Sequence, residues 1–515
     1  MTQYYTIDSI KSILTTGLLI SIFIECAIYP SWENAFGCLA EFYGWFLIKR
    51  TVLKYEYIKK YLIPIVMLFF YGICFFVLPI PVTMIEGKPL TFRFAVPWIT
   101  FSNLMLNATT IVLAFHFCRK IYHEGWLTNI WKRLGYFTPP TSSQIWALGL
   151  LGLLALLWGL SNQGSERMSA ENLGALGQFL NVLRQFGYAP VAFFFTTYYC
   201  AHYKNVNKRI VYLYIALFCL LAIATTRRAM LMDMIVSIAV MLLFVSLIEN
   251  RRLFSTKKII YLVIGFYLLS GPVADLALAM IINRSTSYSN SASSTFSNVI
   301  ELYSDKERLH AAFQMGTFSN SDNSGDNYSA WSEYYIDNIF FDRFCNLRTQ
   351  DITLDYATKL GYGSERMKEY AANFVLFQVP TPVLRAFGYN GNKFENNYTP
   401  GDLLSTDALN LSSQYGGFRV AGDSAVGLAW MGYGYYVFAF LIYVVFFYFM
   451  CSLVSNRYKF IVPVPVIMAM TTYMTYFNNS TGIFRTLSML LRSGWQNILI
   501  YCFLMWLIRL FTKGK

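Results

Sequence analysis

Apolar residues along this chain fall into blocks of roughly 20, and short polar connections separate the blocks. A helix needs about 20 mainly apolar residues to cross the hydrocarbon core of a bilayer, so each block predicts a membrane-spanning helix. We therefore expect an all-α polytopic membrane protein. The blocks predict about twelve spans, near residues 12–29, 34–48, 61–82, 95–117, 143–161, 187–203, 210–225, 229–248, 259–282, 424–452, 460–478 and 495–511.

Lysine and arginine predict the orientation of these spans. Cytoplasmic connections of membrane proteins are enriched in both residues, and alternate connections of this chain are basic. The basic connections are 49–60, 118–133, 202–209, 249–258, 456–459 and 509–515. We therefore expect both termini in the cytoplasm. The connections expected outside are 30–34, 83–94, 162–186, the tip at 227–228, 283–423 and 479–494.

One outer connection, 283–423, is far longer than a connector needs to be. It is rich in Ser, Asn, Asp and Tyr, and it contains helical patterns at 299–315 and about 350–376. We expect a partly helical cap, which follows an N-terminal bundle of about nine helices (1–282) and precedes about three C-terminal helices (424–515). Its amide, hydroxyl and aromatic side chains suit sugar binding, and they equally suit a solvated loop.

Composition agrees with a membrane protein and limits the other classes. Apolar residues make up 56% of the 515 and charged residues 13%, whereas soluble domains carry about a quarter charged residues. The net charge of +13 does not indicate a nucleic-acid partner, because much of the excess lies in short connections between apolar blocks. The nine cysteines form no CxxC motif or Cys/His cluster, so we expect no metal and no other cofactor.

Arginines on the expected outer side are the first candidates for binding an anion. Arg227 and Arg228 stand at a hairpin tip between two apolar runs, against the usual bias of basic residues to the cytoplasmic side. An arginine binds a phosphate through two parallel hydrogen bonds and stays protonated. The alternative is that both side chains extend to lipid phosphates.

Three further arginines lie near the expected outer surface. Arg485 and Arg492 are seven residues apart and would share one face of a helix over 480–494 that lies at the membrane interface. Arg419 stands where the large connection re-enters the membrane. For the arginines of the 480–494 helix, binding to lipid headgroups is the alternative role.

Acidic residues inside apolar blocks form a second group of candidates. Burying a charge in a membrane is expensive, so each such residue is a functional hypothesis. The residues are Glu25, Glu41, Asp233 and Asp275. Asp233 lies about one helical turn from Arg228, and a local ion pair would also explain its presence.

Asp423 and His310 complete the candidates for proton transfer. Asp423 stands at the start of a predicted span, where an aspartate often serves only as a helix cap. His310 is the only histidine on the expected outer side, within a helical pattern that also fits a surface helix. Either residue, like Asp233, could take the proton from a hydroxyl group.

The whole arrangement resembles the bacterial Wzy-type polymerases of O-antigen and polysaccharide repeat units. The resemblance rests on about twelve spans, both ends inside, and one large outer connection before the last helices. It also rests on TTRRAML (225–231), which opens a helix at the outer surface. A third element is FQVPTPVLRAFGYNGN (377–392), which leads to GDSAVGLAWMGYGYYVFAF (422–440).

The resemblance implies a metal-independent glycosyltransferase at the outer, periplasmic face of the bacterial inner membrane. Such an enzyme transfers the growing glycan from undecaprenyl diphosphate to a new lipid-linked unit, alongside a flippase and a chain-length regulator. Outward arginines would stabilise the charge that develops on the leaving diphosphate. We assign that role to Arg227, Arg228, Arg419, Arg485 and Arg492, and the role of base to Asp423, Asp233 or His310.

Three other activities fit parts of the pattern. An O-antigen ligase has a similar outer connection and depends on a histidine there, for which only His310 is available. A lipid-linked oligosaccharide flippase also has about twelve spans, although no two-half symmetry is visible here. A lipid-to-protein glycosyltransferase usually has a long first outer loop, whereas residues 30–34 make only a tight turn.

Overall fold

The fold is given by a computed structural model that describes most of the chain. The described ranges are 6–163, 174–195, 206–224, 228–251, 271–286, 292–309, 334–389, 398–409, 419–456, 460–478 and 482–512, together with Tyr267 and Ala311. Within these ranges the secondary structure is helical, and the single β-type contact is a bridge between Ser455 and Ile461. The all-α prediction is confirmed for this part of the chain.

The chain divides into two compact units, each assembled from separated stretches of sequence. The first unit comprises residues 1–123, 320–451 and 475–496, and the second comprises 124–319, 452–474 and 497–515. The large outer connection predicted at 283–423 is therefore shared between the two units, with most of it in the first.

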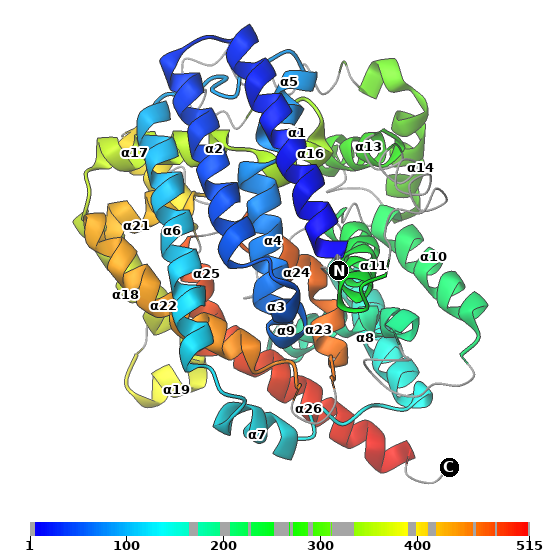
Figure 1. The fold of residues 1–515 in the computed structure, drawn as a ribbon. Helices are drawn as coiled ribbons and strands as arrows, with labels where there is room; N and C mark the ends of the chain where they lie inside the picture. The colour runs from blue at the N-terminus through cyan, green and yellow to red at the C-terminus, as the bar shows by residue number, and fades with distance from the viewer. Residues whose placement is uncertain are drawn as a thin grey trace. The chain divides into compact units, whose positions relative to one another are not determined.

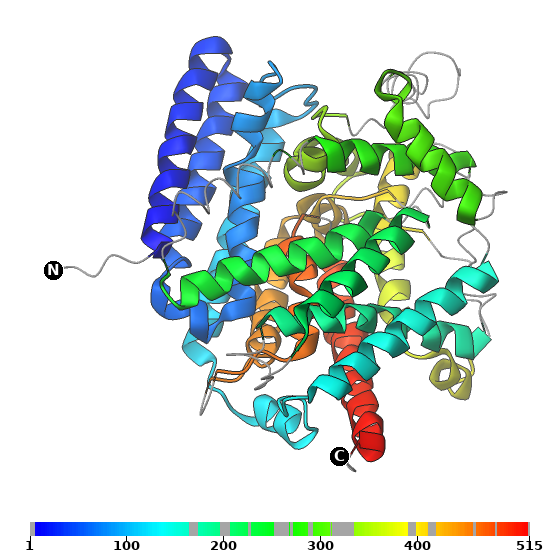
Figure 2. The same cartoon turned by 90° about the vertical axis from the view of Figure 1, so that its right-hand side faces the viewer.

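The first unit starts with two neighbouring helices, α1 and α2, which a tight turn joins at one end (dark blue in Figure 2). Its helices, labelled in Figure 1, are α1 (Thr6–Ile28), α2 (Trp32–Thr51), α3 (Tyr55–Lys60), α4 (Leu62–Phe76), α5 (Pro79–Ile85), α6 (Pro97–Ile121), α16 (Ile339–Cys345), α17 (Arg348–Leu360), α18 (Glu365–Gln378), α19 (Thr381–Ala386), α20 (Pro400–Ala408), α21 (Asp423–Met431), η5 (Gly432–Gly434), α22 (Tyr435–Cys451) and α25 (Ile483–Ser488).

The second unit is also helical throughout its described residues. Its helices are α7 (Trp126–Arg133), α8 (Ser142–Gln163), α9 (Gly174–Leu183), η1 (Arg184–Phe195), α10 (Lys208–Ala224), α11 (Arg228–Ile248), α13 (Pro272–Thr286), α14 (Ala292–Ser304), α23 (Val464–Met468) and α24 (Met470–Met474). A π-helical turn, η6 (Met489–Ser493), connects α25 to α26 (Gly494–Thr512), and α26 passes from the first unit into the second.

Several helices have the length and composition to cross a membrane, so the protein is a membrane-embedded helical protein. Five stretches among the described residues qualify: Thr6–Ile28, Leu62–Ile85, Pro97–Ile121, Asp423–Cys451 and Ile483–Thr512. Two shorter apolar helices cover Ser142–Trp158 and Asp233–Ile248. The total of about twelve spans, and the side on which each connection lies, stay predictions.

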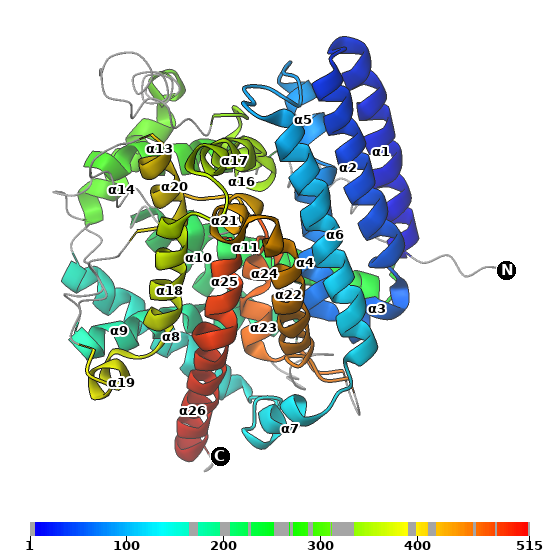
Figure 3. The ribbon, with the colours of Figure 1, turned by 90° about the vertical axis from the view of Figure 1, so that its left-hand side faces the viewer.

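In the first unit, α4 is buried in the interior, whereas α1 lies at the periphery. α4 is apolar on every side and almost wholly buried, as a helix in the middle of a bundle should be. α1 instead exposes a row of large apolar side chains, among them Phe23, which is 78% exposed, and Ile20. That row is suited to contact with lipid. Figure 3 shows α1, α2 and α6 running side by side along this unit.

Prolines and glycines interrupt two of the predicted spans. The span predicted at 61–82 is divided between α4 and α5, because Pro79 cannot donate a backbone hydrogen bond and begins a new helix. The span predicted at 424–452 is divided between α21 and α22 at Gly432, whose φ of 59° suits glycine alone among common residues.

Two other predictions are wrong in their boundaries. Instead of one helix over 460–478, the structure has the short α23 and α24, since Pro463 and Pro465 lie at the start of α23. Instead of a separate interfacial helix over 480–494, α25, η6 and α26 make one continuous stretch of 30 residues. At about 1.5 Å per residue it is about 45 Å long, more than the thickness of a hydrocarbon core of about 30 Å.

The carboxylate of Asp351 joins α17 to the start of α6, and it has no exposed surface. It accepts hydrogen bonds from the Ala95 N–H at 2.6 Å, the Val96 N–H at 2.9 Å and the Thr100 hydroxyl at 3.0 Å. The first N–H groups of a helix lack partners within the helix, so an acceptor from outside is needed there. The Arg348 guanidinium donates to the same carboxylate at 2.7 Å.

We expect Asp351→Ala to lower the free energy of unfolding by about 3–5 kcal/mol, because a largely buried guanidinium and two N–H groups lose their acceptor. The matched control is Asp355→Ala, one turn along α17, which removes only the partner of the exposed Lys359 and should cost less than about 1 kcal/mol. The measurement is denaturant unfolding of the purified protein in detergent micelles. Equal stabilities of the two variants would contradict the proposed importance of Asp351.

Candidate functional site

Two adjoining pockets lie in the first unit, and Phe75 of α4 lines both. We name them the Asp423 pocket and the Arg343 pocket. The polar lining of the Asp423 pocket is Thr100, Asn103, Asn107, Gln350, Asp423 and Ser424. The polar lining of the Arg343 pocket is Asp342, Arg343, Asn346, Thr349 and Asn478. Helices α4, α6, α16, α17 and α21 all contribute residues to this paired site.

Asp423 is the first residue of α21 and is only 6% exposed. Gly422 occupies the N-cap position, and no side chain caps this helix, so the capping role considered for Asp423 is wrong. One carboxylate oxygen, Oδ2, accepts a hydrogen bond from the Tyr443 hydroxyl. The other, Oδ1, is buried and has no hydrogen bond in the described part of the chain. The carboxylate is therefore held at one oxygen and free at the other.

Gly422 brings the start of α21 against α17. Its N–H donates to the Thr353 hydroxyl at 3.1 Å, and a Cβ there would lie 2.3 Å from the Gln350 side-chain oxygen. The break at Gly432 then lets α22 fold back along α21. As a result, Tyr435 and Tyr443, two turns apart on one face of α22, both approach the Asp423 carboxylate.

Four buried oxygen atoms around Asp423 have no hydrogen-bond partner among the described residues. They are Asp423 Oδ1, Asn107 Oδ1 and the hydroxyl oxygens of Tyr71 and Tyr435. Buried polar groups are usually hydrogen-bonded, and an unpaired one costs about 1–3 kcal/mol. One ligand hydroxyl group or one ordered water molecule would satisfy some of them.

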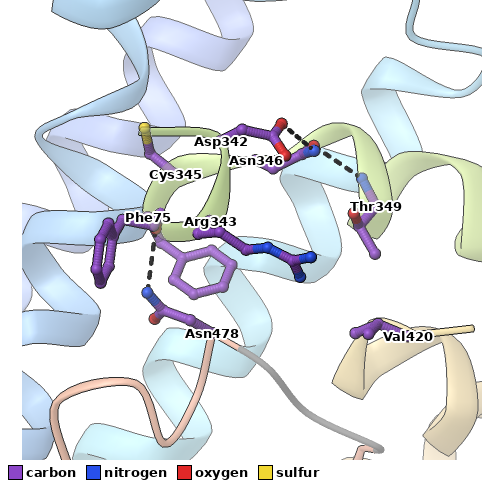
Figure 4. A pocket seen from close by; sticks show the side chains of 9 residues that line it. Phe75, Asp342, Arg343, Cys345, Asn346, Thr349, Val420 and Asn478 are labelled. Atoms are coloured by element: carbon purple, nitrogen blue, oxygen red, sulfur yellow. Dashed lines mark hydrogen bonds between the residues drawn. The ribbon is translucent and has the colours of Figure 1, made fainter. Parts of the chain in front are cut away.

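Arg343 gives the second pocket its positive charge. It lies on α16, is exposed, and extends its guanidinium into the space bounded by Thr349, Val420 and Asn478 (Figure 4). Neither a hydrogen bond nor an ion pair of this guanidinium is found within the described ranges. An arginine in that situation is available for an anionic ligand.

Short contacts hold the rim of the Arg343 pocket in place (Figure 4). The Asn346 amide donates to Asp342 at 2.7 Å, and the Asn346 side-chain oxygen accepts from the Thr349 N–H at 3.3 Å. On the opposite side, the Asn478 amide donates to the Phe344 carbonyl at 3.0 Å. Hydrogen bonds to both side chains and backbone therefore hold the residues around the arginine.

Arg419, expected to bind a diphosphate, is buried beside α20. It is 7% exposed, and its guanidinium donates to the Ser405 hydroxyl at 2.6 Å. Its backbone N–H donates to Asp402 at 3.1 Å, and its carbonyl accepts from the Thr399 hydroxyl at 2.7 Å. In this arrangement Arg419 supports the segment that carries Val420 to the Arg343 pocket.

Arg485 and Arg492 line neither pocket. The Arg485 guanidinium donates to the Tyr476 carbonyl at 2.9 Å and lies 4.6 Å from the centre of the Tyr476 ring, an arrangement that ties α25 to the preceding turn. Arg492 is exposed and donates to Gln496 at 3.3 Å. Its exposure leaves the predicted role in binding lipid phosphates open.

The remaining predicted site residues are Arg227, Arg228, His310 and Asp233, and the structure describes the side chain of Asp233 alone among them. Arg227 and His310 lie outside the described residues, and so does the side chain of Arg228, the first residue of α11. The expected ion pair between Arg228 and Asp233 is therefore untested. Asp233 is half-buried on α11 in the second unit, where its carbonyl accepts from the Thr471 hydroxyl at 2.9 Å.

Sequence reasoning missed most of the pocket lining. Asn103 and Asn107 carried a usable signal, because two amides one turn apart in an apolar span share one face. The structure gives Asn103 a partner, since its side-chain oxygen accepts from the Tyr436 hydroxyl at 2.5 Å. Arg343 carried no such signal, since it is one of several arginines in the long polar connection.

Neither a family model nor a curated protein nor a solved structure matches this chain.

Proposed function

We propose that this protein is a metal-independent glycosyltransferase that extends a polysaccharide from undecaprenyl-diphosphate-linked units at the outer face of a bacterial inner membrane. The observation that carries the proposal is the Asp423 carboxylate, which is buried, held at one oxygen by Tyr443, and free at the other in a polar pocket. The adjoining pocket offers an arginine without a partner in the described residues.

Asp423 has the position of a general base for glycosyl transfer. A hydroxyl of the acceptor sugar would donate its hydrogen bond to the free Oδ1. As that hydroxyl oxygen forms a bond to the anomeric carbon of the donor, its proton passes to Oδ1. The bond between the anomeric carbon and the diphosphate oxygen breaks, and the polyprenyl diphosphate leaves with the electron pair. Tyr443 keeps the carboxylate oriented through Oδ2.

Arg343 has the charge and exposure to stabilise the leaving diphosphate. Negative charge grows on the bridging oxygen as the bond breaks, and a positioned guanidinium lowers the energy of that state. Arg343 thus becomes our first candidate for this role, ahead of Arg419 and Arg485, whose guanidinium groups are bonded within the protein. Arg227 and Arg228 remain proposed contributors.

Lipid-linked oligosaccharide transport is the second candidate function. It is favoured by the breaks between α4 and α5 and between α21 and α22, since transporters place discontinuous helices at their substrate sites. The O-antigen ligase would use the same donor chemistry with another acceptor. These activities differ in which products accumulate and in which leaflet, so a glycolipid gel and a leaflet measurement together separate all three.

We expect Asp423→Asn to abolish chain extension, because the amide keeps the shape of the side chain but does not accept a proton at neutral pH; the loss in rate should be about 100- to 10,000-fold. The assay is a gel of surface glycolipid from a deletion strain complemented with each variant. Loss of the ladder with a core-plus-one-unit band retained supports a polymerase.

The matched control is Asp407→Asn, which removes the half-buried partner of the exposed Arg366 and should leave the ladder unchanged. A wild-type ladder from membrane-inserted Asp423→Asn would rule out this base. Loss of every glycan-bearing band indicates ligation or flipping, and the leaflet in which lipid-linked units accumulate separates those two.

Arg343→Gln should slow the transfer by about 10- to 100-fold, the equivalent of losing one charge-assisted hydrogen bond of about 1.5–3 kcal/mol. Arg343→Lys should recover part of the rate, because the charge remains while the two-pronged geometry is lost. The measurement uses purified protein and a lipid-linked unit. Arg366→Gln serves as the control, and equal rates for the two glutamine variants would remove Arg343 from the site.

A double substitution tests whether Arg227 and Arg228 bind the diphosphate. Replacing Arg227 and Arg228 together by alanine should abolish chain extension while the protein still inserts, if both bind the diphosphate. Chain lengths on the same glycolipid gel provide the readout. Wild-type lengths from a normally inserted double variant would assign both side chains to lipid contact instead.

A further inference from the structure

A second group of buried acids lies in the first unit, on the α1–α2 pair. The buried residues of α2 recur at helical spacing and form one face, and Glu41 lies near the middle of that face. A Cβ at Gly37 would lie 2.6 Å from the Phe101 ring, and one at Gly44 would lie 2.3 Å from the Phe76 ring. Aromatic rings therefore pack on both sides of Glu41, which has no exposed surface.

The Glu41 carboxylate lacks the partners that usually accompany a buried charge. Neither of its oxygens has a hydrogen bond within the described residues. The backbone group that acts on this carboxylate belongs to Ile80. Ile80 lies at the start of α5, where the apolar stretch Leu62–Ile85 is interrupted. Glu25 is close enough to act on it electrostatically, and that carboxylate has the same sign of charge.

Glu25 is also fully buried, and only one of its oxygens is occupied. Its Oε1 accepts from the Asn34 amide at 3.0 Å and from the Leu90 N–H at 2.7 Å. Its Oε2 has no partner in the described structure, and neither does the side-chain oxygen of the buried Asn34. Together with both oxygens of Glu41, this makes four buried acceptor oxygens on the helix pair without a hydrogen-bond donor among the described residues.

No cation of the described chain neutralises these acids. The titratable groups beside them are Cys26, Cys38, Tyr335 and Cys345. Among the described residues, neither a lysine nor an arginine forms an ion pair with Glu25 or Glu41. Lys88, on the segment that Glu25 holds through Leu90, is already paired with Glu86 and Asp337 at 2.9 Å each. Leaving a carboxylate ionised and unpaired in such surroundings costs several kcal/mol.

We propose that Glu25, Asn34 and Glu41 form a binding site for a monovalent cation, H⁺ or Na⁺. Oxygens that only accept are what a proton or a small hard cation requires, and the bound ion would supply the missing positive charge. The Asn34 amide already donates to Glu25, so the Asn34 oxygen provides a neutral ligand beside that carboxylate. This site does not depend on the proposed glycosyl transfer, since none of its residues lines the Asp423 or Arg343 pocket.

The test uses a hydrophobic carbodiimide on the full-length protein in detergent micelles. The reagent adds to a protonated carboxyl group and rearranges to a stable N-acylurea, which peptide mass spectrometry locates. We expect adducts on Glu25 or Glu41 at neutral pH, where an exposed glutamate is ionised and is labelled little. If NaCl lowers the yield compared with choline chloride at equal ionic strength, the ion is Na⁺; if it does not, the ion is H⁺.

Glu365, which is 88% exposed, provides the control carboxylate, and its labelling should not respond to Na⁺. The variant Glu41→Gln should unfold at a temperature that depends less on pH or Na⁺ than that of the wild type, whereas Glu365→Gln should behave like the wild type. The proposal is overturned if neither Glu25 nor Glu41 is labelled in the folded protein at any pH, although both are labelled after denaturation. Failure here leaves the chain-extension assay of Asp423→Asn unaffected, so the two proposals fail separately.

Discussion

Asp351 accepts hydrogen bonds from the backbone at the start of α6, and this contact fixes α17 against the membrane helices. Burial raises the pKa of Asp351, while the N–H groups and the Arg348 guanidinium around it act in the opposite direction. The two residues before it, Thr349 and Gln350, line the Arg343 pocket and the Asp423 pocket. One buried contact therefore fixes α17 beside the start of α6, and with it the two pocket-lining residues of α17.

Hydrophobic patterning was sufficient to predict the helical class and the approximate place of the apolar helices. It also placed Asp423 at the start of one such helix, because an acid at the edge of an apolar block is conspicuous. It could not predict that α21 ends at Gly432 and that α22 folds back along it. Both sides of that glycine are apolar, so the hydrophobic pattern continues through it. The packing of Tyr435 and Tyr443 around Asp423 requires the break.

The arginines show the opposite limit of sequence reasoning. Their charge and expected side of the membrane made Arg419 and Arg485 candidates for a diphosphate site, but the structure gives their guanidinium groups partners within the protein. Arg343 became a candidate only because its neighbours Asp342 and Asn346 bond to each other and leave the guanidinium facing the pocket. The sequence shows that an arginine is charged. Whether its guanidinium is free to bind a ligand depends on every acceptor that its long, flexible side chain can reach in the folded protein.

The buried acids of this protein fall into two groups, and the difference between them points to function. Asp351 and Asp402 have donors on both carboxylate oxygens, from the start of α6 and from the residues Thr399 and Arg419. Each joins two separate segments of the chain. Asp423 and Glu41 are equally buried, yet one has a free oxygen and the other has two. Stability alone would favour replacing such groups with apolar residues. We explain their presence by a ligand at each, a sugar hydroxyl at Asp423 and a monovalent cation at Glu41.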